Sequence, residues 1–145
     1  MDSARDRVDF YTAMFRQGRE ADAFHGLIES DSDVVPELIA LYDRVAGNDL
    51  RAFILGVVSE FHRPFDLSFL KQELLSTEPA ILRRALDGLS NSETPESVQM
   101  MTEAVARIDD PTKRQWVMEA IRDTTIAIKK RAEHGEGGKA SPATS

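Results

Sequence analysis

The chain has 145 residues, enough for one domain whose core needs no cross-links. It has no cysteine, which excludes disulfides, thiolate metal sites and cysteine nucleophiles. The net charge is −7, and residues 20–49 alone account for it with eight acids and one base. Such an acidic region repels phosphate backbones and attracts basic surfaces, so we expect a basic protein partner rather than a nucleic acid. A solvated acidic face that aids solubility would give the same pattern, and that alternative stays open.

The N-terminus is charged and lacks the apolar segment of a secretory signal. The longest apolar run, residues 52–58, is too short to span a bilayer. We therefore expect a cytoplasmic protein that makes no membrane contact.

Apolar residues recur at helical spacing through the first half of the chain, and strand alternation is nearly absent. Ser3 is placed to cap a helix over about 4–17, which Gly18 would end in the left-handed conformation. A second helix runs to about residue 29, and a third follows the turn at 31–33. The fourth has the clearest apolar face in the chain: Leu50, Phe53, Ile54, Val57, Val58 and Phe61.

Four further helix starts are visible in the second half. Asp66 and the segment 77–79 open the fifth and sixth helices. Thr94 and Asp110 each precede a proline, which is a strong signal for the start of a helix. The eighth helix should end near 129–131, where cations suit the helix dipole, and residues 132–145 should form a disordered tail. The pattern thus predicts an all-α fold of about seven to eight short helices in one domain, residues 1–131.

Start signals at Asp49, Thr77 and Asp110 recur at similar intervals, each between two short helices. A helical hairpin that recurs in this way is typical of an α-solenoid, in which stacked hairpins complete one another's core. We therefore predict two N-terminal helices over 1–30 and three hairpins over 34–128.

Residues 34–41, with the early Pro36, resemble the first helix of a HEAT repeat. Residues 49–52 resemble its second helix, with Asp49 near the turn and Arg51 soon after. Two looser copies follow, one with Glu78 and Arg83 or Arg84 and one with Asp110 and Arg114.

The resemblance to HEAT repeats implies antiparallel hairpins stacked as a small α-solenoid, and most such arrays are scaffolds that bind proteins. It also implies that the repeated arginines bond between repeats. Small acidic helical arrays look like bacterial immunity proteins too, which neutralise a cognate toxin.

Catalytic and metal-binding patterns are missing from the sequence. His25, His62 and His134 lie on separate segments without zinc spacing. Residues 31–33 begin like a calcium loop but lack the later ligands. Neither a glycine-rich phosphate loop nor a nucleophile elbow is present. We therefore predict a protein that is not an enzyme and binds no metal or cofactor.

Three groups of residues are candidates for binding a partner. The first is the acidic group Glu29, Asp31 and Asp33, and the second is the elbow after the fourth helix, with Arg63 beside Phe65. The third is the mixed-charge face of the second helices, where we expect these side chains to point outward: Arg51, Leu55, Ser59, Glu60, Arg83, Arg84, Asp87, Arg114, Glu119 and Arg122.

A second hypothesis belongs to another class of function. Some HEAT-like proteins bind nucleic acid or process DNA bases, which here would require one groove that gathers Arg51, Arg84, Arg114 and Arg122. The isoelectric point of about 5.0 argues against such a basic groove. A homodimer that pairs through the open ends of the array is a third hypothesis.

Overall fold

The computed structural model describes residues 3–61 and 67–144, with side chains through His134, and over these ranges the protein is all-α. The helices are α1 (Ala4–Arg16), α2 (Glu20–Ile28), α3 (Val34–Arg44), α4 (Asn48–Glu60), α5 (Leu67–Lys71), α6 (Pro79–Ser92), α7 (Pro95–Val105) and α8 (Pro111–Thr144). The all-α class predicted from the sequence is confirmed.

Several helix ends are set by the local signals that the sequence shows. The side-chain oxygens of Ser3, Thr94 and Asp110 each accept a hydrogen bond from the backbone N–H three residues later, at 3.0, 3.2 and 2.8 Å. These bonds satisfy N–H groups that the first turn of a helix leaves unpaired. Gly18 follows α1 with φ +83°, the left-handed conformation expected for it.

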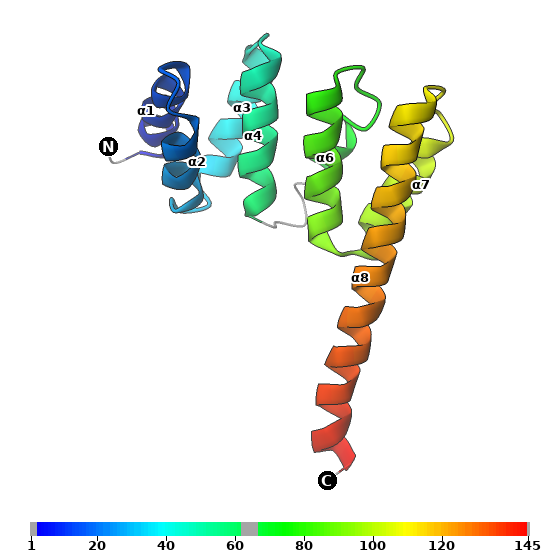
Figure 1. Cartoon of the computed structure of the whole chain (residues 1–145). Coiled ribbons are helices and arrows are strands. Elements are labelled where there is room, and N and C mark those ends of the chain that lie inside the picture. Colours follow the sequence, from blue (N-terminus) through cyan, green and yellow to red (C-terminus); the bar gives the residue numbers. More distant parts are fainter. Residues whose placement is uncertain (1–2, 62–66, 145) are drawn as a thin grey trace.

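Consecutive helices pack against each other as the pairs α1/α2, α3/α4, α5/α6 and α7/α8. The second helices of these pairs, α2, α4, α6 and α8, also pack side by side in chain order (Figure 1). The first helices lie behind them, with α1 on α3 and α5 on α7. We call the outer surface of α2, α4, α6 and α8 the even-helix face.

The core fills the space between the two layers. Its largest fully buried side chains are Tyr42, Leu27, Leu38, Ile54, Leu55, Leu74, Ile81, Leu82, Leu89, Met101, Val34 and Val35. They come from both layers, so each pair of helices completes the apolar surface of its neighbour.

Helices α4 and α6 approach each other closely at Gly88. A Cβ on Gly88 would lie 2.8 Å from Leu70 Cδ1 and 3.1 Å from the Cβ of Ser59. Both Leu55 and Ser59 are buried, so the prediction that they point outward is wrong. The hydrophobic face of α4 is wider than the sequence pattern indicates, because α6 packs where solvent was expected.

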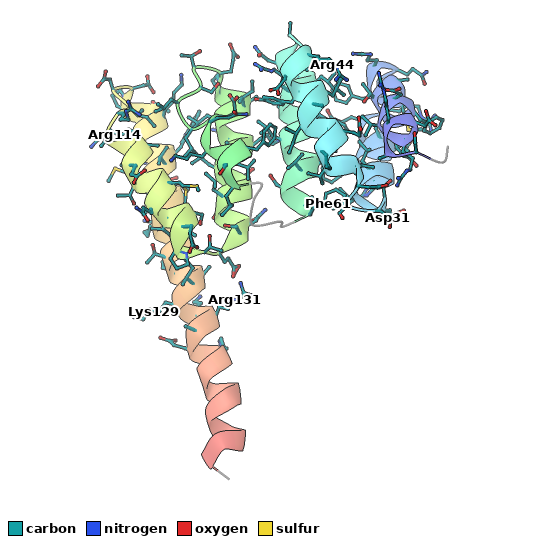
Figure 2. The ribbon with its side chains drawn as sticks, turned by 180° about the vertical axis from the view of Figure 1, so that it is seen from behind. Asp31, Arg44, Phe61, Arg114, Lys129 and Arg131 are labelled. Atoms are coloured by element: carbon teal, nitrogen blue, oxygen red, sulfur yellow. The ribbon has the colours of Figure 1, made fainter. Side chains whose placement is uncertain are left out.

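Helix α8 is longer than predicted. It continues to Thr144, past its expected end near Arg131 and through the segment expected to be disordered. Once the first turns of α8 are fixed against its neighbours, each further residue adds a backbone hydrogen bond without a new nucleation cost. The C-terminal part projects beyond the other helices and carries Lys129 and Arg131 (Figures 1 and 2). In the ranges described, none of the helices has both the length and the apolar character required to cross a membrane.

Candidate functional site

The acidic group at the start of α3 is partly neutralised within the protein. Asp33 accepts a 2.7 Å hydrogen bond and ion pair from Arg7, which ties this turn to α1. Glu29 and Asp31 are exposed at the end of α2 and in the following turn (Figure 2). Of the three acids predicted to bind a partner, Asp33 therefore already has a partner inside the chain.

Arg51 lies inside a helix pair rather than on the binding face. Its guanidinium stands 4.4 Å from the ring centroid of Tyr42, so it links α4 to α3. The hydroxyl of Tyr42 and the Nε of Arg51 are buried without a hydrogen-bond partner. Burial of the Tyr42 hydroxyl, followed by the nearby Glu73 carboxylate, raises the pKa of Tyr42 above its ordinary range. Arg51 therefore serves the packing of α3 on α4.

The residues predicted around the end of α4 are only partly described. Glu60 is the last residue of α4 and is exposed, while Phe61 is half-buried and packs against the core (Figure 2). Arg63 and Phe65 lie outside the described residues.

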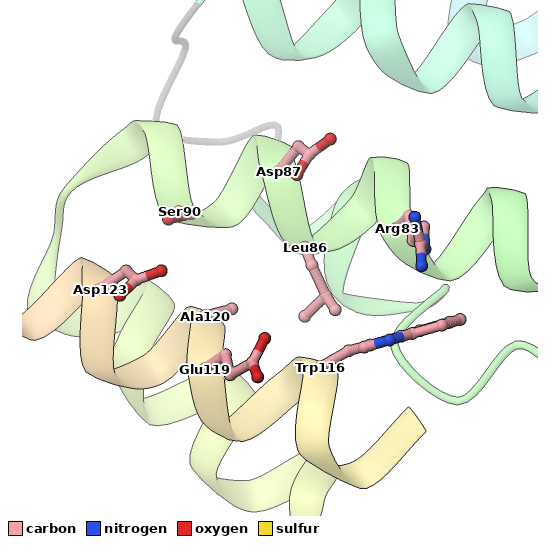
Figure 3. Close-up of a pocket in the computed structure, with 8 residues that line it drawn as sticks. All are labelled: Arg83, Leu86, Asp87, Ser90, Trp116, Glu119, Ala120 and Asp123. Carbon is pink, nitrogen blue, oxygen red and sulfur yellow. The ribbon is translucent and has the colours of Figure 1, made fainter. Parts of the chain in front are cut away.

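A cavity of about 400 Å³ lies between α6 and α8, on the even-helix face (Figure 3). Three carboxylates line it, Asp87 from α6 and Glu119 and Asp123 from α8. We call these residues, together with Arg83 and Trp116, the α6/α8 site.

Arg83 and Trp116 form one wall of the α6/α8 site. The guanidinium of Arg83 lies 4.2 Å from the ring centroid of Trp116, which is a cation–π contact between the two helices. Arg83 precedes Asp87 by one helical turn, yet it stacks on the ring instead of pairing with that carboxylate. In the part of the chain described, Asp87 has neither a hydrogen bond nor an ion pair.

The two carboxylates on α8 are only weakly engaged. Glu119 accepts a 3.0 Å hydrogen bond from the Gln115 side chain, and Asp123 lies 3.6 Å from the exposed guanidinium of Arg122. Exposed contacts of this kind contribute little to stability. The carboxylates of the α6/α8 site are therefore available to a cation from outside.

A buried hydrogen bond connects the two walls beside the site. Thr124 Oγ1 donates to Ser90 Oγ at 2.8 Å, and the same hydroxyl lies 2.6 Å from the carbonyl oxygen of Ala120. Thr124 is fully buried, so this contact joins α8 to α6 next to the site.

The α6/α8 site combines exposed carboxylates with an aromatic ring. Its carboxylates are solvent-exposed, and over the described ranges the structure contains no group of three or more His, Cys, Asp or Glu side chains placed to hold a metal ion. The three carboxylates match the guanidinium of a partner's arginine through ion pairing, while Arg83 already stacks on the Trp116 ring.

A second, smaller cavity of about 280 Å³ lies on the other side of α6, against α2 and α4. Phe24, Phe53 and Gly56 line it, and the predicted binding residue Arg84 stands at its edge. Arg84 and Asp87 thus lie on opposite sides of α6, in two different cavities.

The four arginines of the nucleic-acid hypothesis do not share one cavity, although Arg114 and Arg122 line the same one. Arg51 stacks on Tyr42, and Arg84 lines the smaller cavity. Arg114 donates a 2.8 Å hydrogen bond to the carbonyl of Val105 at the α7–α8 turn. The structure therefore supplies no single groove shared by all four.

Sequence reasoning placed Asp87 and Glu119 on one outward face but did not connect them to Asp123 or to the Arg83–Trp116 contact. The signal available was the spacing of four between Arg83 and Asp87, and again between Glu119 and Asp123, which puts each pair on one helix face. Which face of α6 meets α8 depends on packing between distant segments, and the spacing does not reveal it.

Comparisons of the chain with protein-family models, curated proteins and solved structures gave no match. The interpretation of the site therefore depends on the geometry above.

Proposed function

We propose that this protein is a non-catalytic binding module that holds a basic protein partner on its even-helix face. The observation that carries the proposal is the α6/α8 site, where carboxylates from two helices line a cavity with a tryptophan ring at one end (Figure 3). A field of three carboxylates speeds the encounter with a basic surface, and the aromatic wall adds contact area for its side chain.

The arrangement of the helices supports a short α-solenoid as the scaffold. Adjacent helix pairs, with the second helices packed side by side, are what stacked antiparallel hairpins of the HEAT type require. Such arrays present one continuous face to a partner, and the α6/α8 site lies at the boundary between two pairs. The proposal thus places binding on a surface that exists only when the pairs are stacked.

One version of the proposal is that the partner is a toxin made in the same cytoplasm, which the protein neutralises as immunity proteins do. The acidic character of the chain and the HEAT-like pattern of residues 34–128 support this version. A toxin that acts on nucleic acid presents a basic surface, which is the charge that the α6/α8 site would recognise.

Charge reversal at the site tests the proposal. Protein tagged at the N-terminus is used to recover partners from the source lysate, as wild type and as the double variant Asp87→Lys/Glu119→Lys. The matched control is Glu96→Lys/Glu103→Lys, which makes the same charge change on exposed positions of α7. We expect a basic protein to be recovered with the wild type and the control but lost with the site variant. Equal recovery by all three proteins would contradict the proposal.

A further inference from the structure

The even-helix face has a second cavity, beyond α6, which the acidic site does not use. Its walls are the aromatic rings of Phe24 and Phe53, which meet edge to face with centroids 6.3 Å apart. Phe53 also packs on Phe15, with centroids 4.6 Å apart, so these rings belong to one aromatic cluster. Phe53 is buried and Phe24 is half-buried, so the cavity exposes only part of this cluster.

The edge of this cavity carries a cation without an internal partner. Arg84 makes no ion pair and no hydrogen bond within the ranges that the structure describes. Glu20 and His25 also line the cavity, but neither is bonded to Arg84. A guanidinium next to a half-buried aromatic ring such as Phe24 attracts both a carboxylate and a further ring.

Gly56 keeps the cavity open. A Cβ at this position would lie 3.5 Å from an Nη atom of Arg84, which is ordinary contact, so the helix tolerates a side chain here. The absence of that side chain leaves space between α4 and the arginine. The volume of about 280 Å³ is below the range of cofactor pockets and corresponds to one side chain of a partner.

We propose that this cavity is a second anchor point for the same partner, and that it takes an aromatic side chain with a neighbouring carboxylate. This inference rests on the proposed function, because it assumes that the partner lies across the even-helix face. The two cavities flank α6, so their occupants stand about 10 Å apart, the width of a helix. In an extended segment that distance separates a basic residue from an aromatic one about three positions away.

N-acetylphenylalanine is the probe for the second anchor, since it carries a ring and a carboxylate. In a nuclear magnetic resonance titration of the ¹⁵N-labelled full chain, we expect the backbone amide signals of Gly56 and Arg84 to shift saturably. A dissociation constant on the order of a few mM is expected for a ligand of this size. No saturable shift at these two amides up to about 20 mM probe would overturn the inference.

Three variants make the titration specific. Gly56→Leu fills the cavity and should weaken binding at least about tenfold, whereas Gly56→Ala adds only a methyl group and should keep it within about threefold. Arg84→Gln should weaken binding of N-acetylphenylalanine but not of its amide, which lacks the carboxylate. Binding to Gly56→Leu that equals binding to the wild type would overturn the inference.

The two sites can fail independently. Gly56→Leu leaves the α6/α8 site intact, so the change in Trp116 fluorescence when a triarginine amide peptide is added, a direct readout of that site, should stay the same. If the wild type binds N-acetylphenylalanine at Gly56 but shows no response to the arginine peptide, the proposed function fails. If the arginine peptide binds and N-acetylphenylalanine does not, the second anchor fails and the proposed function stands.

Discussion

The guanidinium of Arg83 lies 4.2 Å from the ring centroid of Trp116, so one side chain of α6 covers the single tryptophan of the chain. We predict that Trp116→Ala lowers the free energy of unfolding by about 2–3 kcal/mol, less than for a fully buried ring because Trp116 is half-buried. Arg83→Ala should cost about 0.5–1 kcal/mol. Urea unfolding followed by circular dichroism measures both.

The double variant shows whether the two side chains act together. We expect a coupling free energy of about 0.5–1 kcal/mol, because the cation–π contact is lost once in either single variant. Losses that simply add would mean that the contact contributes nothing to holding α6 against α8.

Two glycines in neighbouring helices should respond in opposite ways to alanine. Gly88→Ala pushes a methyl group into Ser59 and Leu70, so it should lower the free energy of unfolding by about 1–3 kcal/mol. In Gly56→Ala the new methyl group makes only ordinary contact with Arg84. The higher helix propensity of alanine should therefore raise the free energy of unfolding by about 0.5–1 kcal/mol. Thermal unfolding of the two variants beside the wild type checks the pair, and a stabilising Gly88→Ala would contradict the close packing of α4 on α6.

The raised pKa of Tyr42 predicts that the protein loses stability at high pH. Its pKa in the folded protein is raised by burial and by Glu73, so the unfolded state loses the phenolic proton first. The stabilisation that comes from this raised pKa is fully present below about pH 10, the pKa of tyrosine in the unfolded chain. The free energy of unfolding falls as the pH rises above that value. In Tyr42→Phe this fall should be shallower. Urea unfolding at about pH 8 and pH 10.5 measures the difference.

At neutral pH the same variant tests the unpaired hydroxyl. The hydroxyl of Tyr42 is buried without a hydrogen bond, so its removal should leave the free energy of unfolding unchanged or raise it by up to about 1 kcal/mol. A marked destabilisation by Tyr42→Phe would show that the hydroxyl has a partner that stabilises the fold.

Charge reversal should affect stability differently at Asp31 and at Asp33, although they are two residues apart. Asp33→Lys breaks the ion pair with Arg7 and places two cations together, so it should lower the free energy of unfolding by about 1 kcal/mol. Asp31→Lys should stay within about 0.5 kcal/mol of the wild type, since Asp31 is exposed. Chemical unfolding measures these effects on stability. Because only Asp31→Lys leaves the stability nearly unchanged, a loss of partner binding in that variant can be assigned to the lost charge.

Local signals explain most of what the sequence predicted correctly. The caps at Ser3, Thr94 and Asp110 act on backbone groups three residues away, and Gly18 needs only its own backbone freedom. Helix caps and turns of this kind depend only on residues a few positions apart in the chain, so they could be predicted before the fold was known.

Packing between distant helices could not be read in the same way. The helical spacing placed Ser59 at an outward position together with Leu55, but α6 buries Ser59 and its hydroxyl donates to the carbonyl of Leu55 at 2.7 Å. Trp116 and Arg83 are also far apart in the chain, and their contact depends on which side of α6 meets α8. The candidate site is made of such long-range contacts, which explains why Asp123 and the Arg83–Trp116 contact were not predicted as part of it.

The fluorescence of Trp116 offers the most direct test of the α6/α8 site, because this ring lines the site and is the only tryptophan in the chain. The full chain is titrated with a triarginine amide peptide at about 50 mM and about 500 mM salt. The electrostatic screening length falls about threefold between these two conditions. We predict a saturable fluorescence change at low salt that weakens at high salt. The change should be lost in Asp87→Lys/Glu119→Lys and kept in Glu96→Lys/Glu103→Lys. No change in the wild type, or the same change in both double variants, would contradict a binding site for basic partners between α6 and α8.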